Sequence, residues 1–525
     1  MAEIILITGG SRSGKSAFAQ KTAEALPGPR AYIATCPVID PETEERIRKH
    51  REARSGKGWE TIEETVDLAG VIRRAGACRV LLIDCLTLWI NNLLYEAEKR
   101  EGIFTEEAAV GRCRELIDAC GTFPGTVIFV TNELGMGIVP DNETARRFRD
   151  IAGRCNQEIA AAADTVTLVV SGIILQDTIS AIVPQDAAFR AQAHRRLEAL
   201  TMPYWALGRL LDLAEDLAGI TRSMRPPIAR KAIFTMAGDH GVVAEGVSKF
   251  PQEVTPQMVY NFVAGGAGIN ALARQVGATV TIVYMGVAGD MSGLAAAGKI
   301  LSRRIGPGTK NMAEGPAMSR EEAVRAVEAG IDIARKAAET VDLFGTGDMG
   351  IGNTTPSSAI VAAFSGHPAA EVTGHGTGID DEQFAHKVRV IEKCLRINRP
   401  DPKDGLDVLA KVGGFEIGGI AGLILGAAAL KKPVVIDGFI SAAGALIAYA
   451  LCPTAAEYMI AAHRSVEQGH RIALEILGKQ PLIDLDLRLG EGTGAALAMN
   501  FIEAAVRILT EVATFDEAMV SKASS

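Results

Sequence analysis

Several common sequence signatures are scarce or missing in this 525-residue chain. Aromatic residues make up only 5% of it and the net charge is −9, and no basic, aromatic-rich stripe typical of a nucleic-acid-binding surface occurs. The eight cysteines lie at irregular spacings without a Cys-x-x-Cys pair, which argues against a zinc site or a disulfide framework. No basic segment followed by an apolar one precedes the first strand pattern, so no signal peptide is expected. These absences favour a cytoplasmic protein that does not bind nucleic acid.

Long apolar runs are confined to one region. Residues 417–430 and 433–452 are strongly apolar, a Lys-Lys-Pro segment separates them, and Asp437 interrupts the second. The first run is shorter than the ~20 residues that cross a bilayer. We therefore predict a buried helix and a buried strand here, and no membrane span.

Strand-length apolar runs alternate with helical patterns along the whole chain, which predicts parallel sheets covered by helices. The fold class is α/β: a P-loop NTPase-like parallel-sheet domain, followed by a second Rossmann-like α/β domain with additional helices. The pattern changes near 180–185, so we place the domains at 1–182 and 183–525, with a helix over 186–200. The expected strands are 3–8, 79–84, 126–131 and 165–171, then 232–236, 280–285, 341–344 and 434–436. The 55 glycines cluster in short runs, which suggests backbone that approaches ligands closely.

The first strand pattern enters a glycine-rich turn that opens a helical pattern over 15–25. The turn matches the phosphate-binding motif GxxxxGK[ST] in the strand–helix context that the motif requires. Its backbone N–H groups and the helix N-terminus would bind phosphate oxygens, Lys15 would reach the β- and γ-phosphates, and Ser16 would ligate Mg²⁺. An ordinary turn with a surface lysine is the weaker alternative. The predicted nucleotide-binding residues of the turn are Gly9, Gly10, Ser11, Arg12, Ser13, Gly14, Lys15 and Ser16.

Two further residues of the first domain are candidates beside the P-loop. Asp84 ends an apolar strand pattern, and an aspartate in this position helps to hold Mg²⁺ in P-loop proteins; strand ends also carry Asp as a turn residue. His50 lies in a charged helical stretch, and taken alone it would be an exposed helix histidine. Imidazole can nevertheless attack phosphorus and form a covalent intermediate.

Ordered motifs then make the first third resemble a known family. They are the P-loop, Ala-Tyr-Ile-Ala-Thr at 31–35, Arg-Ile-Arg-Lys-His at 46–50, Asp-Cys-Leu-Thr-Leu-Trp at 84–89, Thr-Asn-Glu-Leu-Gly-Met-Gly-Ile-Val-Pro at 131–140 and Gly-Arg-Cys-Asn-Gln at 153–157. Over about 1–180 the chain resembles the adenosylcobinamide kinase / adenosylcobinamide-phosphate guanylyltransferase family. The resemblance implies phosphorylation of adenosylcobinamide by GTP or ATP with Mg²⁺, then GMP transfer from GTP through a guanylylated His50. It also places Glu133 near the nucleotide.

The second domain contains two glycine-rich segments, at 345–355 after a predicted strand and at 374–378. Either could cradle a phosphate, and Lys387 offers a cation for the same anion. The predicted phosphate- or nucleotide-binding residues are Asp348, Gly350, Gly352, Asn353, Thr354, Gly376, Gly378 and Lys387. The Asp239-His240 pair has no third ligand at a useful spacing, so no metal is assigned there.

Glu491 stands between Gly490 and Gly492, whose small size leaves room for a flat ring beside the carboxylate. In an apolar pocket such a carboxylate has a raised pKa and can act as a general base. A glutamate in the first turn of a helix is the competing interpretation, and the local sequence alone does not separate the two.

Over about 186–520 the chain resembles a second family, nicotinate-nucleotide–dimethylbenzimidazole phosphoribosyltransferase. The matching runs lie at 237–242, 245–248, 251–258, 347–355, 387, 412–417, 435–440, 463–465, 467, 469–470 and 488–495. The resemblance implies transfer of phosphoribose from nicotinate mononucleotide to dimethylbenzimidazole with inversion at the anomeric carbon, and it makes Glu491 the base. Two positions depart from the family pattern: Asp348 replaces the usual glutamate, and Trp205 replaces a glycine near the expected pocket mouth.

The leading hypothesis is a bifunctional enzyme of cobamide nucleotide-loop assembly that takes small-molecule substrates. We expect a homo-oligomer. One alternative keeps the N-terminal enzyme and makes the C-terminal half a ligand-binding module, or a transferase for a purine or phenolic acceptor. Another is a generic P-loop kinase fused to an unrelated α/β domain, but it leaves His50 and the ordered motifs unexplained.

Overall fold

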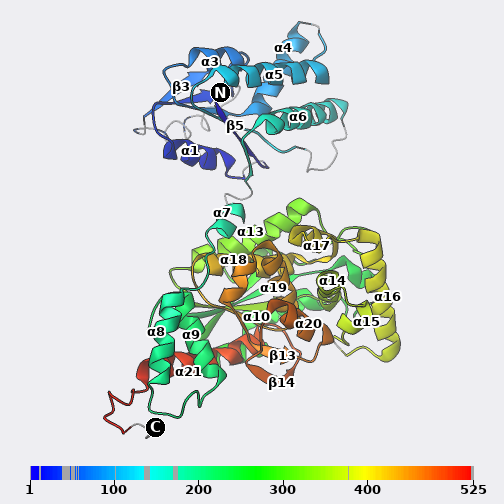
Figure 1. Ribbon diagram of the computed structural model, residues 1–525. Coiled ribbons are helices and arrows are strands. Elements are labelled where there is room, and N and C mark those ends of the chain that lie inside the picture. Colours follow the sequence, from blue (N-terminus) through cyan, green and yellow to red (C-terminus); the bar gives the residue numbers. More distant parts are fainter. Residues whose placement is uncertain are drawn as a thin grey trace. The chain divides into compact units, whose positions relative to one another are not determined.

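The computed structural model describes residues 2–10, 13–37, 48, 54, 56, 58–100, 102–134, 142–169, 175–376 and 378–521. The chain forms two compact units that divide between Ile174 and Leu175 (Figure 1). The sequence-based division after residue 182 differs from this one by the short helix α7 (Leu175–Ser180). Helix α7 contacts α13 (Arg320–Ala337) and α18 (Phe415–Ala429), which groups it with the second unit.

The first unit is built on a six-stranded parallel sheet in the order β3-β2-β4-β5-β1-β6. Its strands are β1 (Glu3–Thr8), β2 (Arg30–Ala34), β3 (Trp59–Glu63), β4 (Val80–Asp84), β5 (Thr126–Val130) and β6 (Thr165–Leu168). Its described helices are α1 (Lys15–Ala25), α3 (Leu68–Arg74), α4 (Leu86–Lys99), α5 (Glu106–Thr122) and α6 (Glu143–Ala162). The predicted parallel sheet with helices between its strands is confirmed, and helix α1 has the predicted bounds.

Both faces of this sheet carry buried apolar side chains, because successive side chains of a strand point to opposite sides. Ile5 and Ile7 of β1 pack with Ala19 and Ala23 of α1 in one buried cluster. Their neighbours along β1, Ile4 and Leu6, belong to a second cluster that includes residues of α3, α4, α5 and α6. The P-loop helix therefore lies on one face, and the other helices cover the opposite face.

The second unit contains a six-stranded parallel sheet in the order β12-β11-β10-β7-β8-β9, and a separate parallel pair, β13-β14. The strands are β7 (Lys231–Gly238), β8 (Ala278–Gly286), β9 (Leu301–Ser302), β10 (Leu343–Met349), β11 (Val434–Ile436), β12 (Met459–Ala461), β13 (His463–Ser465) and β14 (Ile483–Leu487). Beside α7, α13 and α18, the helices are α8 (Ala187–Glu198), α9 (Arg209–Thr221), η1 (Gly241–Glu245), α10 (Val254–Ala264), α11 (Gly268–Val276), α12 (Ser292–Ala296), α14 (Thr354–Ser365), α15 (Ala369–Val372), α16 (Asp381–Asn398), α17 (Gly405–Val412), α19 (Phe439–Leu451), η2 (Pro453–Tyr458), α20 (Gln468–Leu477) and α21 (Thr493–Glu511).

Two helical layers enclose this second sheet. Helices α8, α9, α11 and α21 share one buried cluster with inward residues of β7, β8 and β10. Helices α13, α18 and α19 pack together, with α18 also contacting β7, β8 and β10 (Figure 1). Every residue of α18 from Phe415 to Ala428 is buried. The close α13–α18 packing depends on glycine, because a Cβ added to Gly422 would lie 1.7 Å from the carbonyl oxygen of Val327. Part of the glycine content thus serves helix packing.

The apolar region near the C-terminal end has the predicted character. Residues 417–430 lie almost entirely within buried helix α18, and 433–452 contain strand β11 and buried helix α19. Within the part of the chain that the structure describes, no helix is both long and apolar enough to cross a membrane.

One predicted loop is instead part of a strand. Residues 345–349 were expected in a phosphate-binding loop, but β10 extends through Met349. The segment forms a strand because its glycines allow close approach: a Cβ on Gly347 would lie 2.4 Å from the carbonyl oxygen of Glu491. Asp348 therefore stands near the carboxyl end of a central strand, where ligands bind in open α/β sheets.

Candidate active sites

The P-loop of the first unit connects β1 to α1. Gly14 has φ 89° and precedes the first residue of α1, a left-handed conformation that glycine adopts without strain. The Lys15 side chain is buried and its Nζ donates to the carbonyl oxygen of Gly10 at 3.1 Å. Gly9 passes so close to β6 that an added Cβ would lie 2.2 Å from the carbonyl oxygen of Val169. The predicted residues Ser11 and Arg12 lie outside the described residues.

Asp84 is the last residue of β4, and a single strand, β5, separates β4 from β1 in the sheet. The Tyr32 hydroxyl of β2 donates to Oδ2 of Asp84 at 2.9 Å. Burial raises the pKa of the Cys85 thiol to about 11, helped by Asp84 and opposed by Lys15. Lys15 and Asp84 therefore both act on the same buried group, at the carboxyl ends of the strands.

Ser16 and Asp84 carry the kinds of donor atom that a magnesium ion prefers. Hydroxyl and carboxylate oxygens are its preferred donors, and Mg²⁺ usually takes one or two carboxylates plus substrate phosphates. Among the described residues, no group of three His, Cys, Asp or Glu side chains could hold a metal by itself. Water molecules or the phosphate oxygens of a ligand would complete the coordination.

Glu133 lies directly beside the P-loop, since its backbone N–H donates to the carbonyl oxygen of Gly9 at 3.1 Å. A buried polar chain positions this segment: Thr131 Oγ1 donates to Asn156 at 2.7 Å, and Asn156 Nδ2 donates to the carbonyl oxygen of Asn132 at 3.1 Å. Residues 131–134, the described part of the motif at 131–140, thus meet the motif at 153–157. The predicted nucleophile His50 lies outside the described residues.

In the second unit Glu491 lies at a turn between β14 and α21. Three consecutive residues are left-handed, with φ 81° at Gly490, 64° at Glu491 and 100° at Gly492. Glu491 is 5% exposed, and its Oε2 accepts the N–H of Ile269 at 3.0 Å. Burial raises its pKa, although backbone hydrogen bonds from Ile269 and Gly268 oppose the rise. Burial and a raised pKa are both properties that favour a carboxylate acting as a general base.

Asp437, which the sequence analysis did not assign, holds this turn in place. It is fully buried after β11, where its Oδ2 accepts the N–H of Gly492 and its Oδ1 that of Ala495, both at 3.0 Å. Burial raises the pKa of Asp437 to about 7, against the effect of these hydrogen bonds. The signal in the sequence was a single carboxylate inside an apolar run.

Asp348 and Asn353 link Glu491 to the start of α14. Glu491 donates its backbone N–H to the carbonyl oxygen of Asp348 at 3.2 Å, and Asn353 Nδ2 donates to the Asp348 carboxylate at 3.1 Å. Burial raises the pKa of Asp348 well above its usual range, and the charges of Asp437, Glu416 and Glu491 add to the effect. Several carboxylates thus share a region from which water is largely excluded.

Lys387 reaches the same helix end from α16. Its Nζ donates to Thr354 Oγ1 at 2.8 Å and to the carbonyl oxygen of Gly374 at 3.3 Å. Gly376 is adjacent, since a Cβ added to it would lie 3.4 Å from Lys387 Nζ. Burial lowers the pKa of Lys387 to about 8, and Glu467 opposes the change. The structure therefore brings Thr354 of the first glycine-rich segment and Gly376 of the second together at Lys387.

His240 and Glu416 form a second buried polar group beside this site. His240 Nε2 lies 2.8 Å from Glu416 Oε1, and both side chains are essentially inaccessible. Burial opposes a charge on His240, but Glu416 and Asp239 outweigh it and raise its pKa. Gly350 lies beside this group: a Cβ added there would lie 3.4 Å from His240 Nε2, and 2.1 Å from the carbonyl oxygen of Gly238.

Comparison with known proteins finds a matching family for each of the two units. Residues 182–520 match the family described as phosphoribosyltransferase. The chain belongs to the phosphoribosyltransferase family. Residues 5–176 match the family described as cobinamide kinase / cobinamide phosphate guanyltransferase. Both families consist of transferases, so the chain is an enzyme of this class.

Three similar proteins align with the phosphoribosyltransferase unit. Nicotinate-nucleotide–dimethylbenzimidazole phosphoribosyltransferase of Syntrophotalea carbinolica is 66% identical over 66% of this chain and 99% of its own length. The protein of the same name from Geobacter sulfurreducens is 59% identical, over 66% of this chain and 99% of its own length. The crystal structure of CobT from Thermus thermophilus covers 64% of this chain and all of its own, with 46% identity and a TM-score of 0.61.

Trp205, one departure noted in the sequence, lies between α8 and α9 of the phosphoribosyltransferase unit. Its ring centroid is 5.0 Å from that of His194, and its Nε1 donates to Asp212 at 2.9 Å. The other departure, Asp348, retains a hydrogen-bond partner in Asn353.

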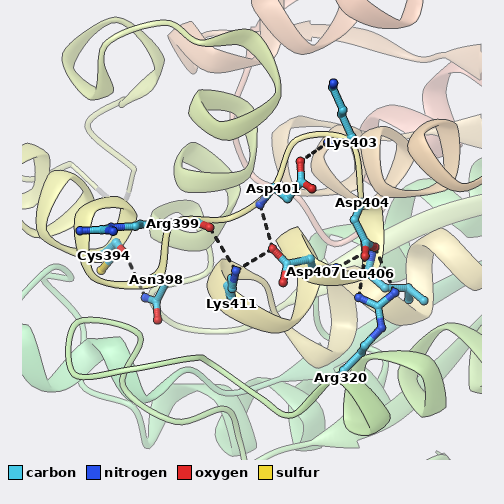
Figure 2. A network of polar contacts seen from close by, with 10 residues as sticks. All are labelled: Arg320, Cys394, Asn398, Arg399, Asp401, Lys403, Asp404, Leu406, Asp407 and Lys411. Atoms are coloured by element: carbon cyan, nitrogen blue, oxygen red, sulfur yellow. Dashed lines mark hydrogen bonds and ion pairs between the residues drawn. The ribbon is translucent and has the colours of Figure 1, made fainter.

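A cavity of about 600 Å³ lies elsewhere in the phosphoribosyltransferase unit, and its lining includes Arg320, Asp407 and Lys411. Figure 2 shows how its cations are paired: Arg320 Nη1 donates to Asp404 at 2.7 Å, and Lys411 Nζ lies 2.9 Å from Asp407. Carboxylates neutralise these two cations, and a third, Lys310, also lines the cavity. Since two of the three cations are paired, we assign no phosphate to this cavity.

Proposed function

We propose that the chain is a bifunctional enzyme of cobamide nucleotide-loop assembly. The observation that carries the proposal is the continuous polar connection from Glu491 through Asp348 and Asn353 to the Lys387–Thr354 pair. It offers a base and a phosphate-binding cation in one buried site. The match of residues 5–176 to a cobinamide kinase / guanyltransferase family supports the part of the proposal that concerns the first unit.

In the second unit, Lys387 and the N-terminal turn of α14 bind the 5′-phosphate of nicotinate mononucleotide. One ring nitrogen of dimethylbenzimidazole attacks the anomeric carbon while Glu491 accepts the proton of the other nitrogen. The bond to nicotinate breaks, nicotinate leaves with the electron pair, and α-ribazole phosphate forms with inversion. Burial of Glu491 supports this assignment, because it increases the proton affinity of the carboxylate.

In the first unit, the P-loop and Lys15 bind the phosphates of GTP or ATP, and Glu133 lies beside them. Mg²⁺ held by Ser16 and Asp84 would neutralise phosphate charge. The terminal phosphoryl group passes to the hydroxyl of adenosylcobinamide. His50 then attacks the α-phosphorus of GTP and releases pyrophosphate, and the substrate phosphate displaces the histidine to give adenosylcobinamide-GDP.

The decisive experiment for the second unit follows nicotinate release from nicotinate mononucleotide in the presence of dimethylbenzimidazole. The full chain should release nicotinate, and Glu491→Gln should lose about 10²–10⁴-fold in rate, the usual contribution of a general base. Glu475→Gln, which changes an exposed glutamate on α20, is the matched control. No release with dimethylbenzimidazole, purines or phenols would overturn the transferase proposal and favour a ligand-binding module.

A further inference from the structure

Glu245, the last residue of η1, joins segments of the second unit that are distant in the sequence. Its Oε1 accepts the side-chain amide of Asn311 at 2.8 Å, and its Oε2 accepts a hydrogen bond from Lys393 Nζ on α16 at 3.2 Å. Its backbone carbonyl oxygen accepts the Nε2 N–H of His386, also on α16, at 2.6 Å. Glu245 therefore bonds to α16 at two points that lie about two helical turns apart.

Helix α16 also carries Lys387, the cation of the proposed phosphate site. Lys387 directly follows His386 and donates from the helix to Thr354 Oγ1 at 2.8 Å. Consecutive side chains of a helix diverge by about 100°, so α16 can bind Glu245 with one side while Lys387 extends toward α14 from another. Any shift of α16 relative to Glu245 would therefore move Lys387 as well.

The same short helix, η1, packs against the other wall of the phosphate site. A Cβ added to Gly352, in the β10–α14 connection, would lie 2.6 Å from Cγ2 of Val243 on η1. Asn353 and the first turn of α14 follow Gly352 directly. Helix η1 thus contacts the start of α14 through Val243 and α16 through Glu245, and these are the two elements on either side of the proposed phosphate.

The segment around Asn311 supports this arrangement from outside. Asn311 bonds to Glu245, and the carbonyl oxygen of the next residue, Met312, accepts the side-chain amide of Asn398 at the end of α16 at 2.7 Å. The hydrogen bond from Asn311 lowers the pKa of Glu245, and Lys393 adds to the effect against a smaller opposing contribution from burial. The carboxylate is therefore ionised near neutral pH, as an ion pair with Lys393 requires.

We infer that Glu245 is a positioning residue for Lys387: it fixes α16 against η1 and so sets the distance between the Lys387 ammonium and the first turn of α14. The inference rests on the proposed transferase function, in which this gap holds the phosphate of nicotinate mononucleotide. The Glu245 and Lys393 side chains are 21% and 40% exposed, and pairs of this kind add little stability. Loss of the pair should therefore change phosphate binding more than folding.

The test uses the full chain and measures binding of nicotinate mononucleotide and of dimethylbenzimidazole by calorimetry. The variants are Glu245→Ala, which removes both side-chain bonds, and Glu245→Gln, which keeps an acceptor for Asn311. Glu245→Ala is also made in a Lys387→Met background, because such a cycle isolates the coupling between two residues. Glu475→Ala, at an exposed glutamate of α20, is the control.

We expect Glu245→Ala to weaken nicotinate mononucleotide binding about 3–10-fold, less than loss of Lys387 itself because the ammonium is displaced and not removed. The effect should disappear in the Lys387→Met background, and Glu245→Gln should recover part of it. Dimethylbenzimidazole binding and the unfolding temperature should stay unchanged.

Three results would overturn the inference. Wild-type binding in Glu245→Ala would show that the contact positions nothing. An equal loss in both backgrounds would show that Glu245 acts independently of Lys387. Weaker binding of both ligands together with a lower unfolding temperature would indicate a general structural role.

The binding measurements need no turnover, so they separate this inference from the proposed function. A wild-type chain that binds nicotinate mononucleotide but releases no nicotinate contradicts the proposed function alone. A wild-type chain that does not bind nicotinate mononucleotide contradicts both.

Discussion

Asn353 donates its side-chain amide to the carboxylate of Asp348 at 3.1 Å, and both residues are buried. Asp348 lies on β10 and accepts the backbone N–H of Glu491, whereas Asn353 immediately precedes α14. This single contact joins the segment of the proposed base to the segment of the proposed phosphate site.

The contact predicts that the side-chain shape of Asp348 matters more than its charge. Its pKa is raised by burial and by neighbouring carboxylates, so a neutral amide should replace it well. We expect Asp348→Asn to cost less than ~1 kcal/mol of stability and to keep most nicotinate release. Asp348→Ala leaves the Asn353 amide without an acceptor and should cost about 1–3 kcal/mol. Thermal unfolding and nicotinate release measure both; equal damage by the two variants would show that the ionised carboxylate is required.

Lys387 should make nicotinate mononucleotide binding depend on pH. Burial lowers its pKa to about 8, so the lysine is charged below this pH and loses its charge as the pH rises through it. The KM for nicotinate mononucleotide should therefore rise between pH 7 and pH 9.5.

Substitutions make this test specific. Lys387→Met should raise the KM about 10–100-fold at pH 7, the cost of a lost charged hydrogen bond. Lys387→Arg should remove the pH dependence, because arginine stays charged. Lys336→Met, at an exposed lysine on α13, is the control. A wild-type KM that stays constant across this range would argue against a phosphate contact by Lys387.

Gly350 should tolerate no side chain. A Cβ there would lie 2.1 Å from the carbonyl oxygen of Gly238, so β7 or the β10–α14 connection would have to move. We expect Gly350→Ala to cost about 1–3 kcal/mol and to reduce transfer activity by displacing Asn353. The comparison is Gly293→Ala on α12, where an added Cβ meets no atom within 4 Å. Matching unfolding temperatures for the two variants would refute the steric argument.

His50 should carry the guanylyl group in the first unit. Incubation of the full chain with [α-³²P]GTP should label the protein, and His50→Asn should abolish the label while phosphorylation of adenosylcobinamide continues. Lys15→Ala should suppress both reactions, because it removes the cation that contacts the phosphates. His194→Gln, at a partly exposed histidine of the second unit, should label normally. Persistent labelling of His50→Asn would assign the nucleophile to another residue.

Local backbone structure was predictable from the sequence at the P-loop and less so at residues 345–349. The P-loop and helix α1 are set by neighbouring residues, so the motif and the strand–turn–helix context could be read together. Residues 345–349 were misplaced because glycines usually interrupt strands, whereas here they permit a close approach of Gly347 to Glu491.

Contacts between distant segments could not be predicted in this way. Tyr32 meets Asp84 only because β2 and β4 are adjacent, and strand order is not written in the local pattern. Asp437 holds Gly492 across 55 positions, so its isolation in an apolar run indicated a role without naming a partner. Both contacts depend on the topology of the sheet.

The anchoring of Glu491 also sets an order of events during synthesis. Its carboxylate and the turn that carries it are held by Ile269, Asp348 and Asp437, all of which leave the ribosome earlier. The groups of the first unit lie within residues 1–174, which form a compact unit of their own. Because domains generally fold as they emerge, the P-loop site can be complete while the base of the second site has not yet been translated. A chain stalled on the ribosome before residue 491 would thus carry the whole first unit but lack the proposed base of the second.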